Sequence, residues 1–247
     1  MDKVSKVFIT GGRGYVGNYI LKTSAARYLD VMHYAMTRDG NLKSSDSHVN
    51  SLENVKGVKG DCLDVSNFPE ELPSCDSLVH CVGTLIQGRD HNSSWDVMNT
   101  ETCVNMAKAF NDAAKEQEVE KTFVMISAEK PPPFLDGYTE TKREAEKYLL
   151  DECDNLRVHI LRPGFIVDPT ERNWSQPLAC AVTFGYNLNQ QIVQKTPLGS
   201  TLDFLFPAQP IPLVKLAEVA AEAAQNKLPP QIWSNDMLLN FEREASH

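Results

Sequence analysis

The sequence predicts an α/β fold in which a doubly wound parallel sheet carries helices on both faces. Two observations support this prediction. Short apolar runs typical of strands alternate with segments of helical periodicity, an order that requires parallel strands joined by helical crossovers. The first apolar run also ends in a glycine-rich turn that opens directly into a helix, Thr10-Gly11-Gly12-Arg13-Gly14-Tyr15-Val16-Gly17. The 247 residues fit a single domain, of which residues 168–247 are expected to form a small C-terminal lobe.

The expected elements follow the chain in a regular order. Strands are predicted at Val4–Thr10, Val31–Met36, Val55–Gly60, Asp76–Val82, Thr122–Ser127 and Leu156–Leu161. Helices are predicted at Tyr15–Leu29, Ser94–Lys115, Asp136–Leu150, Trp174–Val193 and Ile211–Asn226, followed by a short helix capped by Ser234. His80 falls inside the fourth strand, where a histidine that is satisfied in the core is expected more often than a catalytic one.

Composition excludes several classes of protein. The formal net charge of −9 argues against a nucleic-acid surface, which needs a basic face. No apolar run approaches the ~18 residues that span a bilayer, and the first strand is expected to begin too early for a leader peptide. No metal site is expected, because the six cysteines have no metal-ligand spacing and indicate reduced, buried thiols of an intracellular protein. They are Cys62, Cys75, Cys81, Cys103, Cys153 and Cys180.

The glycine turn predicts a dinucleotide site. It satisfies both T-G-x-x-G-x-x-G and G-x-G-x-x-G, and a strand before it with a helix after it is the context that makes such a pattern specific. The turn brings free backbone N–H groups and the positive end of a helix dipole to one point, which suits a pyrophosphate. We therefore expect a Rossmann fold whose first turn binds the cofactor through Thr10, Gly11, Arg13, Gly14, Tyr15, Val16 and Gly17.

The end of the second strand bears on the choice of cofactor. An acidic residue there holds a ribose 2′-hydroxyl, whereas an arginine suits a 2′-phosphate. Arg38 follows a position where the acid is expected and missing, and Arg13 is a second candidate cation. These residues favour NADP(H) over NAD(H), with the alternative that Arg38 is only a solvated loop charge. Asp61, just after the third strand, is expected to accept from the adenine amino group.

Gly83 follows the fourth strand and lets the backbone come close to a ligand. The other residues expected to line the cofactor site lie at or just after the ends of the third, fourth and sixth strands. They are Cys62, Cys81, Val82 and Pro163.

Tyr138 and Lys142 form a second constellation. Residues four apart share a helix face, so the phenol and the ammonium are expected to point into one site and to contact the cofactor. The lysine charge, together with an oxidised nicotinamide, is expected to lower the pKa of the tyrosine from near 10. Tyr138 would then exchange a proton with a carbonyl or an alcohol. Ser127, at the end of the fifth strand, is expected to hold the substrate oxygen.

These motifs together resemble the short-chain dehydrogenase/reductase superfamily, in its extended or atypical branch. The resemblance rests on an ordered set that covers nearly the whole chain. The set consists of Thr10–Gly17, Gly60-Asp61, Asn99-x-x-Thr102-x-x-Asn105, Ser127, Tyr138-x-x-x-Lys142, Leu161-Arg162-Pro163-Gly164 and the segment from Pro210 to Ala220.

Three phrases are similar to a narrower group, the mitochondrial atypical dehydrogenases. They are Val79–Leu85, Tyr138–Glu146 and Leu161–Phe165. That group includes the nucleotide-binding accessory subunit of respiratory complex I and a related protein of coenzyme Q (ubiquinone) biosynthesis. The resemblance implies tight NAD(P)H binding and a structural or regulatory role inside or beside a large mitochondrial membrane complex, on the matrix side of the inner membrane. A cytoplasmic location is the alternative.

Two departures from the extended enzymes favour holding the cofactor over turnover. Only eleven positions separate Ser127 from Tyr138, and the stiff Pro131-Pro132-Pro133 lies between them. The C-terminal lobe is also small. The alternative is an active NADPH-dependent oxidoreductase acting on a small carbonyl or isoprenoid-type substrate through Ser127, Tyr138 and Lys142. A third possibility is a scaffold that senses the oxidation state of the cofactor.

Overall fold

The structure is a computed structural model that describes residues 5–42, 51–129, 136–168 and 208–242. Its centre is a sheet of seven strands, all of them parallel to their neighbours. The strands are β1 (Lys6–Thr10), β2 (Met32–Thr37), β3 (Val55–Lys59), β4 (Ser77–His80), β5 (Lys121–Ile126), β6 (Leu156–Leu161) and β9 (Ile232–Trp233). Their spatial order is β3-β2-β1-β4-β5-β6-β9. The predicted doubly wound parallel α/β fold is confirmed.

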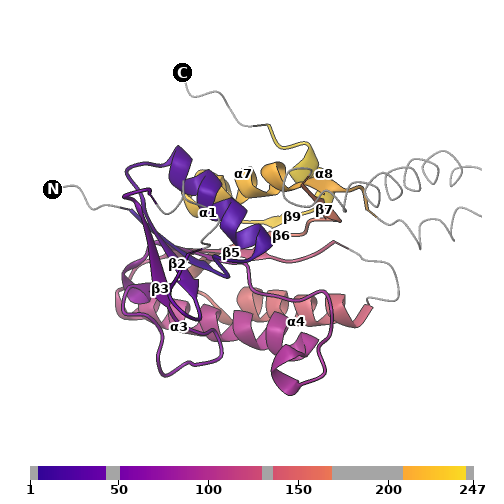
Figure 1. Cartoon of the computed structure of the whole chain (residues 1–247), viewed down its shortest axis with the longest axis horizontal. Coiled ribbons are helices and arrows are strands. Elements are labelled where there is room, and N and C mark those ends of the chain that lie inside the picture. The colour runs from indigo at the N-terminus through magenta and orange to yellow at the C-terminus, as the bar shows by residue number, and fades with distance from the viewer. Residues whose placement is uncertain (1–4, 43–50, 130–135, 169–207, 243–247) are drawn as a thin grey trace, which may run out of the picture.

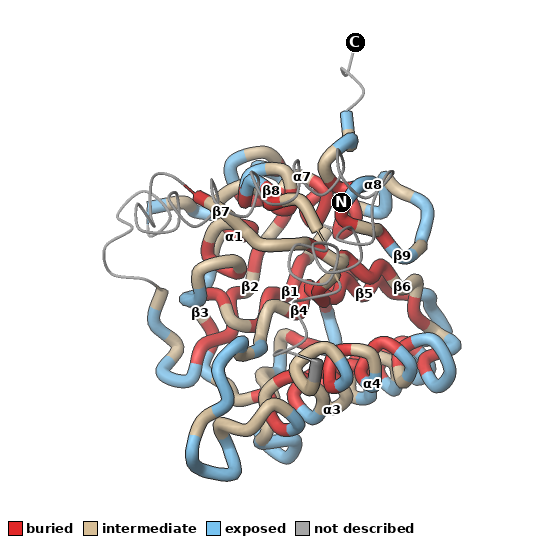
Figure 2. The backbone as a smooth tube through the Cα atoms, turned by 90° about the vertical axis from the view of Figure 1, so that its right-hand side faces the viewer, coloured by how far each residue is buried: buried red, intermediate tan, exposed pale blue. Residues whose placement is uncertain are grey.

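Helices cover both faces of this sheet (Figure 1). One layer contains α1 (Tyr15–Arg27), α7 (Leu213–Ala224) and the short α8 (Asn235–Leu239), and the other contains α3 (Thr102–Glu116) and α4 (Asp136–Glu152). Figure 2 shows buried residues concentrated in the strands and on the inner sides of the helices. Among the described residues, no helix is both long enough and apolar enough to cross a membrane.

The sheet separates two hydrophobic cores. Alternate residues of β1 point to opposite faces, so Val7 and Ile9 belong to the core under α1 and α7, while Phe8 belongs to the core under α3 and α4. Phe110 of α3 and Leu149 of α4 fill the second core. Because both faces are covered, the strands read as short apolar runs rather than as alternating ones.

The predicted helix Ser94–Lys115 differs from the structure at its start. Residues Asp96–Glu101 form a π-helical segment, and the regular α-helix begins only at Thr102. The segment includes Asn99, whose side-chain amide bonds to the backbone of Thr84 instead of facing solvent. Single π-helical turns are frequent at functional sites.

The described C-terminal part of the chain contains short strands as well as helices. The helix predicted from Ile211 starts at Leu213, because Ile211–Pro212 forms a strand, β8, that pairs with β7 (Ile166–Val167). The two-residue β9 extends the main sheet beside β6. Within the predicted lobe, β8 belongs to a separate two-stranded sheet and β9 to the main sheet, while the predicted helix Trp174–Val193 lies outside the described residues.

The predicted cap of the last helix is confirmed. Ser234 precedes α8, and its side chain accepts a hydrogen bond from the backbone N–H of Met237.

Candidate functional site

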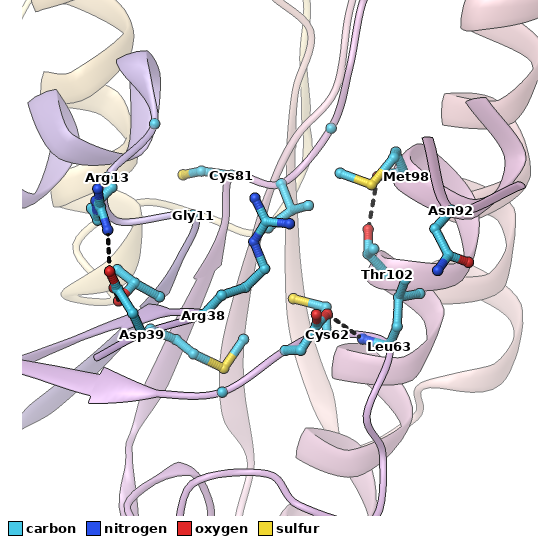
Figure 3. Close-up of a pocket in the computed structure, with 17 residues that line it drawn as sticks. Gly11, Arg13, Arg38, Asp39, Cys62, Leu63, Cys81, Asn92, Met98 and Thr102 are labelled. Carbon is cyan, nitrogen blue, oxygen red and sulfur yellow. Dashed lines mark hydrogen bonds and ion pairs between the residues drawn. The ribbon is translucent and has the colours of Figure 1, made fainter. Parts of the chain in front are cut away.

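A pocket of about 730 Å³ lies at the carboxyl ends of the first four strands. Its walls come from the segments that follow β1, β2, β3 and β4, together with the π-helical segment and the start of α3. The strand order reverses between β1 and β4, and ligands of doubly wound sheets bind at such a switch point. The volume is typical of a site for a small organic ligand. Figure 3 shows the residues that line it.

The glycine turn follows β1 and forms one wall of this pocket. Gly11 has a left-handed backbone, with φ of +68°, which glycine adopts without strain. The N–H of Gly14 donates to the carbonyl of Gly11 at 2.8 Å, and no side chain caps the start of α1. A Cβ on Gly17 would collide with the Gly11 carbonyl. The N-terminus of a 13-residue helix therefore adjoins a pocket whose wall is bare backbone, the arrangement that binds phosphate groups.

Two arginines and an aspartate stand at the end of β2. Arg13 and Asp39 form an ion pair of 2.6 Å across the mouth of the pocket. The backbone N–H of Asn41 and the Arg13 guanidinium hold the pKa of Asp39 well below its usual range. Figure 3 shows Arg38 reaching into the pocket between Gly11 and Cys62, while Arg13 turns toward Asp39. Arg38 thus extends into the pocket, and Asp39 is an acidic group that the sequence analysis missed.

The remaining pocket walls follow β3 and β4. Asp61 lines the pocket and accepts a hydrogen bond from the backbone N–H of Leu63 at 3.0 Å. Cys62 and Cys81 also line it, and burial raises the pKa of the Cys81 thiol to about 12. Both thiols are free, and their burial makes them poor nucleophiles. Val82 and Gly83 complete this wall.

Several residues predicted to bind the cofactor are not among those that line the pocket. Thr10 is fully buried, and its hydroxyl is hydrogen-bonded to His80. Pro163 is buried, and its carbonyl accepts from the backbone N–H of Glu129. Tyr15, Val16 and Gly17 lie in the first turn of α1, and Tyr138 and Lys142 of α4 are likewise not among the residues that line the pocket.

The neighbours of His80 determine which of its two ring nitrogens carries the hydrogen. The Thr10 hydroxyl lies 3.0 Å from Nδ1 and accepts from the backbone N–H of Cys81. The Thr102 hydroxyl lies 3.5 Å from Nε2 and donates to the carbonyl of Met98. These partners leave Nδ1 as the acceptor and Nε2–H as the donor. Burial lowers the pKa of His80 to about 3, so the expected role of a neutral core histidine is confirmed.

Lys142 is buried beside the end of β4. Its ammonium donates to the carbonyl of Ile126 at 3.2 Å and to that of Val82 at 3.4 Å. A Cβ on Gly83 would come within 2.8 Å of this ammonium and 2.9 Å of the Asn99 amide oxygen. The missing side chain of Gly83 therefore lets the lysine and the asparagine approach the pocket wall from behind.

The expected effect of Lys142 on Tyr138 is not found. Burial raises the pKa of the Tyr138 phenol to about 12, and the charge that opposes this shift is that of Arg143. Desolvation disfavours the phenolate, and the ammonium of Lys142 is directed at two backbone carbonyls. The predicted lowering of the tyrosine pKa involves an oxidised nicotinamide as well as Lys142, and it stays a prediction for the protein with its cofactor bound.

Ser127 is buried, only 3% exposed, at the end of β5. Its hydroxyl donates to a carboxylate oxygen of Glu146 and accepts from Arg143 at 3.2 Å. The structure thus brings Ser127 close to the helix that carries Tyr138 and Lys142, but joins it to a different residue of that helix.

Asn99 is the other group that the sequence analysis did not assign. Its amide nitrogen donates to the carbonyl of Thr84 and, at 3.3 Å, to the hydroxyl of Thr141. Its amide oxygen accepts from the N–H of Thr84 at 2.9 Å. Asn99 thus joins the loop after β4 to α4. The polar segment Asn99–Asn105 was visible in the sequence, although nothing in its spacing indicated a π-helical turn.

The fold and the pocket define an NAD(P)-binding protein of the extended short-chain dehydrogenase/reductase superfamily. The model of a more specific family, described as male sterility protein with an NAD-binding domain, matches residues 54–205, more than half of the chain. The chain belongs to this family. The predicted superfamily and nucleotide-binding fold are therefore confirmed.

Two curated relatives are similar over about two thirds of this chain. A protein of Arabidopsis thaliana, named as uncharacterized and chloroplastic, is 33% identical over 171 residues, which cover 66% of this chain and 51% of that protein. A protein of Saccharomyces cerevisiae, named MIOREX complex component 2, is 23% identical over 206 residues, which cover 67% of this chain and 74% of the yeast protein. The chain thus spans about half the length of the plant relative.

Several solved structures share the fold. A short-chain dehydrogenase/reductase from Mycobacterium ulcerans is 17% identical with a TM-score of 0.64, over 95% of this chain and 90% of that one. ElxO, solved with NADP bound, is 16% identical with a TM-score of 0.58, over 96% and 99%. WbmG from Bordetella bronchiseptica, solved with NAD and UDP, is 15% identical with a TM-score of 0.58, over 92% and 71%.

Proposed function

We propose that this protein holds NADP(H) as a stable part of a larger assembly and carries out little or no turnover. The observation that carries the cofactor half of this proposal is the pocket itself. Bare glycine backbone at the start of α1 suits the pyrophosphate, and Asp61 lies at the far wall for the adenine. The glycines at positions 11 and 17 allow the turn and the start of α1 to pack this closely, because a Cβ on either would press on backbone atoms of Cys81 or Gly11.

The preference for NADP(H) rests on the charges at the end of β2. Arg38 faces the pocket, and Arg13 stands beside it in an exposed ion pair with Asp39. A 2′-phosphate supplies the charge and the geometry that a guanidinium binds best. NAD(H) would instead place its ribose 2′-hydroxyl near Asp39, which stays ionised because its pKa is depressed. Two cations against one anion favour the phosphorylated cofactor.

The assembly half of the proposal rests on the relatives and on the resemblance of the residues. The yeast relative is named as a component of a complex. The residues resemble the accessory subunit of respiratory complex I and the related ubiquinone-pathway protein. We propose a partner complex of that kind, in the mitochondrion on the matrix side of the inner membrane. The chloroplastic name of the plant relative also favours an organelle.

The native protein tests this proposal directly. Purification under mild conditions is expected to retain a dinucleotide, identified as NADP(H) by mass spectrometry, and to recover other polypeptides at fixed ratio. Recovery of a monomer that neither retains nor binds a dinucleotide would refute the cofactor half. A cofactor-loaded monomer with no partner in any fraction would refute the assembly half.

A second function is favoured by one observation. Tyr138 and Lys142 lie one turn apart on α4, and Lys142 contacts the backbone beside the pocket through Val82. This arrangement fits an NADPH-dependent oxidoreductase that reduces a small carbonyl, with Tyr138 giving the proton. Its test is NADPH consumption over a panel of carbonyl compounds, with Tyr138→Phe as the comparison. Equal rates in the two proteins would remove Tyr138 from the mechanism.

A further inference from the structure

Four side chains form a cluster around a buried carboxylate where α4 meets the ends of β5 and β6. We call Ser127, Arg143, Glu146 and Arg162 the Glu146 cluster. One carboxylate oxygen of Glu146 accepts from the Ser127 hydroxyl, from Arg143 and, at 3.1 Å, from Nε of Arg162. The other oxygen accepts from Nη2 of Arg162. Two guanidinium groups and a hydroxyl thus surround one carboxylate that is itself 3% exposed.

The cluster continues the face of α4 that carries Tyr138 and Lys142. Glu146 comes four residues after Lys142 and eight after Tyr138, so the three side chains lie on one stripe. Lys142 donates to the carbonyl of Ile126 at the end of β5. Glu146 accepts from the next residue, Ser127.

Arg143 adds a third tie between α4 and the end of β5. It donates to the carbonyl of Ala128 at 2.9 Å. Side chains of α4 therefore hold three consecutive residues at this point, Ile126, Ser127 and Ala128.

The hydrogen bonds of Ser127 leave it no proton for a ligand. A serine hydroxyl has a single hydrogen, and that of Ser127 goes to the Glu146 carboxylate. Its oxygen already accepts from Arg143, and its backbone N–H donates to the carbonyl of Leu161 at 2.7 Å. A substrate carbonyl could bind to this hydroxyl only by displacing it from a buried carboxylate, which would lose a charge-assisted hydrogen bond.

We infer that Ser127 and Glu146 are positioning residues that clamp α4 to the sheet, so that Tyr138 and Lys142 remain the candidates for ligand contact within the expected catalytic set. The inference rests on the proposed function in one respect, namely that the ligand is a dinucleotide. It explains why the site would hold a cofactor without the full set of groups that turnover requires.

A double-mutant cycle tests the clamp. Ser127→Ala is expected to lower the thermal midpoint by about 4 to 8 °C, since it removes a hydrogen bond to a charged group in a chain of this size. In the Glu146→Gln background the same change is expected to cost less than half of that shift. Where Glu146→Gln does not fold, Arg143→Met takes its place in the cycle, because Arg162 stays on Glu146. Equal shifts in the two backgrounds would overturn the clamp.

Binding of NADPH separates positioning from ligand contact. Ser127→Ala is expected to leave the Kd of NADPH and the emission of the bound nicotinamide unchanged within about twofold, while Lys142→Met weakens binding at least about tenfold. In Glu146→Gln, the emission of bound NADPH is expected to change at temperatures where circular dichroism shows a folded protein. That change reports a moved α4, which a loss of stability alone does not produce.

The two failures can be told apart. Weaker NADPH binding by Ser127→Ala, with an unchanged thermal midpoint, would make the serine a ligand group and overturn the inference. If the wild type bound no dinucleotide, the proposed function would fail, while the double-mutant cycle would still decide whether the clamp exists.

Discussion

Arg38 provides the sharpest test of cofactor choice. The change Arg38→Ala removes the guanidinium that Figure 3 shows inside the pocket and leaves the ion pair between Arg13 and Asp39 in place. A hydrogen bond to a charged group contributes about 1.5 to 3 kcal/mol, which corresponds to a Kd about 10- to 150-fold higher for NADPH. NADH lacks the 2′-phosphate, so its Kd is expected to change by less than about twofold.

The assay is a fluorescence titration of each cofactor at low and high salt. The loss for NADPH is expected to shrink as salt rises, because the mouth of the pocket is open to solvent and salt screens the charges. Arg89→Ala is the matched control, since Arg89 is exposed and is not among the residues that line the pocket. An equal loss for NADPH and NADH would refute this assignment, because it would mean that Arg38 serves the shared part of the two cofactors.

Three further predictions follow from neighbouring groups. Asp39→Asn is expected to tighten NADPH binding several-fold, because it releases Arg13 from its ion pair, and to weaken NADH binding, because it removes the anion near the ribose hydroxyl. Calorimetric titration measures both affinities. A change of the same sign for the two cofactors would contradict the reasoning. Gly17→Ala is expected to abolish cofactor binding, because the added Cβ would collide with the carbonyl of Gly11. Gly14→Ala is the control: its Cβ would lie 3.1 Å from its nearest neighbour, and the variant should bind the cofactor within about tenfold of wild type. Loss of cofactor binding in both variants would count against the close-approach argument. Burial lowers the pKa of His159 from 6.5 to about 4, so the unfolded chain takes up a proton first as the pH falls, and about 1.5 kcal/mol of stability is lost between pH 6.5 and about pH 5. Urea unfolding of His159→Leu should show a pH dependence that is flatter by this amount, and an unchanged slope would refute the assignment.

The strands and the glycine turn could be predicted because their signals are local. β6 occupies the predicted residues Leu156–Leu161, and β1 differs only at its start. The strands are short apolar runs because both faces of the sheet are buried. The turn is rich in glycine because a side chain there would block the close approach of backbone and ligand.

The short strands were missed for the opposite reason. β7, β8 and β9 have two residues each, and each exists only because a distant segment lies beside it. Ile211 pairs with Ile166 and Trp233 with Leu161. Two residues cannot show a period, so no pattern in the sequence indicates them.

Side-chain partners were the hardest part of the site to predict. Asp39 follows Arg38 directly, yet its pairing with Arg13 depends on how two turns meet after folding. The spacing of four residues places Tyr138, Lys142 and Glu146 on one side of the helix and could be read from the sequence. If Glu146 is buried, its carboxylate needs a hydrogen-bonding or oppositely charged partner. That this partner includes Ser127 depends on the packing of α4 against the end of β5.

The packing of α7 against α1 has a consequence for how the chain is made. Ile20 and Leu21 of α1 share a core with Leu216 and Ala217 of α7. The two helices are about two hundred residues apart in the chain, so the ribosome makes α7 long after α1. The segments that build most of the pocket leave the ribosome early, whereas the helix that closes this face of the sheet emerges late. During translation the early strands and α1 therefore expose an apolar surface until α7 is made. Nucleotide binding at that stage would stabilise the part of the sheet that α7 has not yet covered.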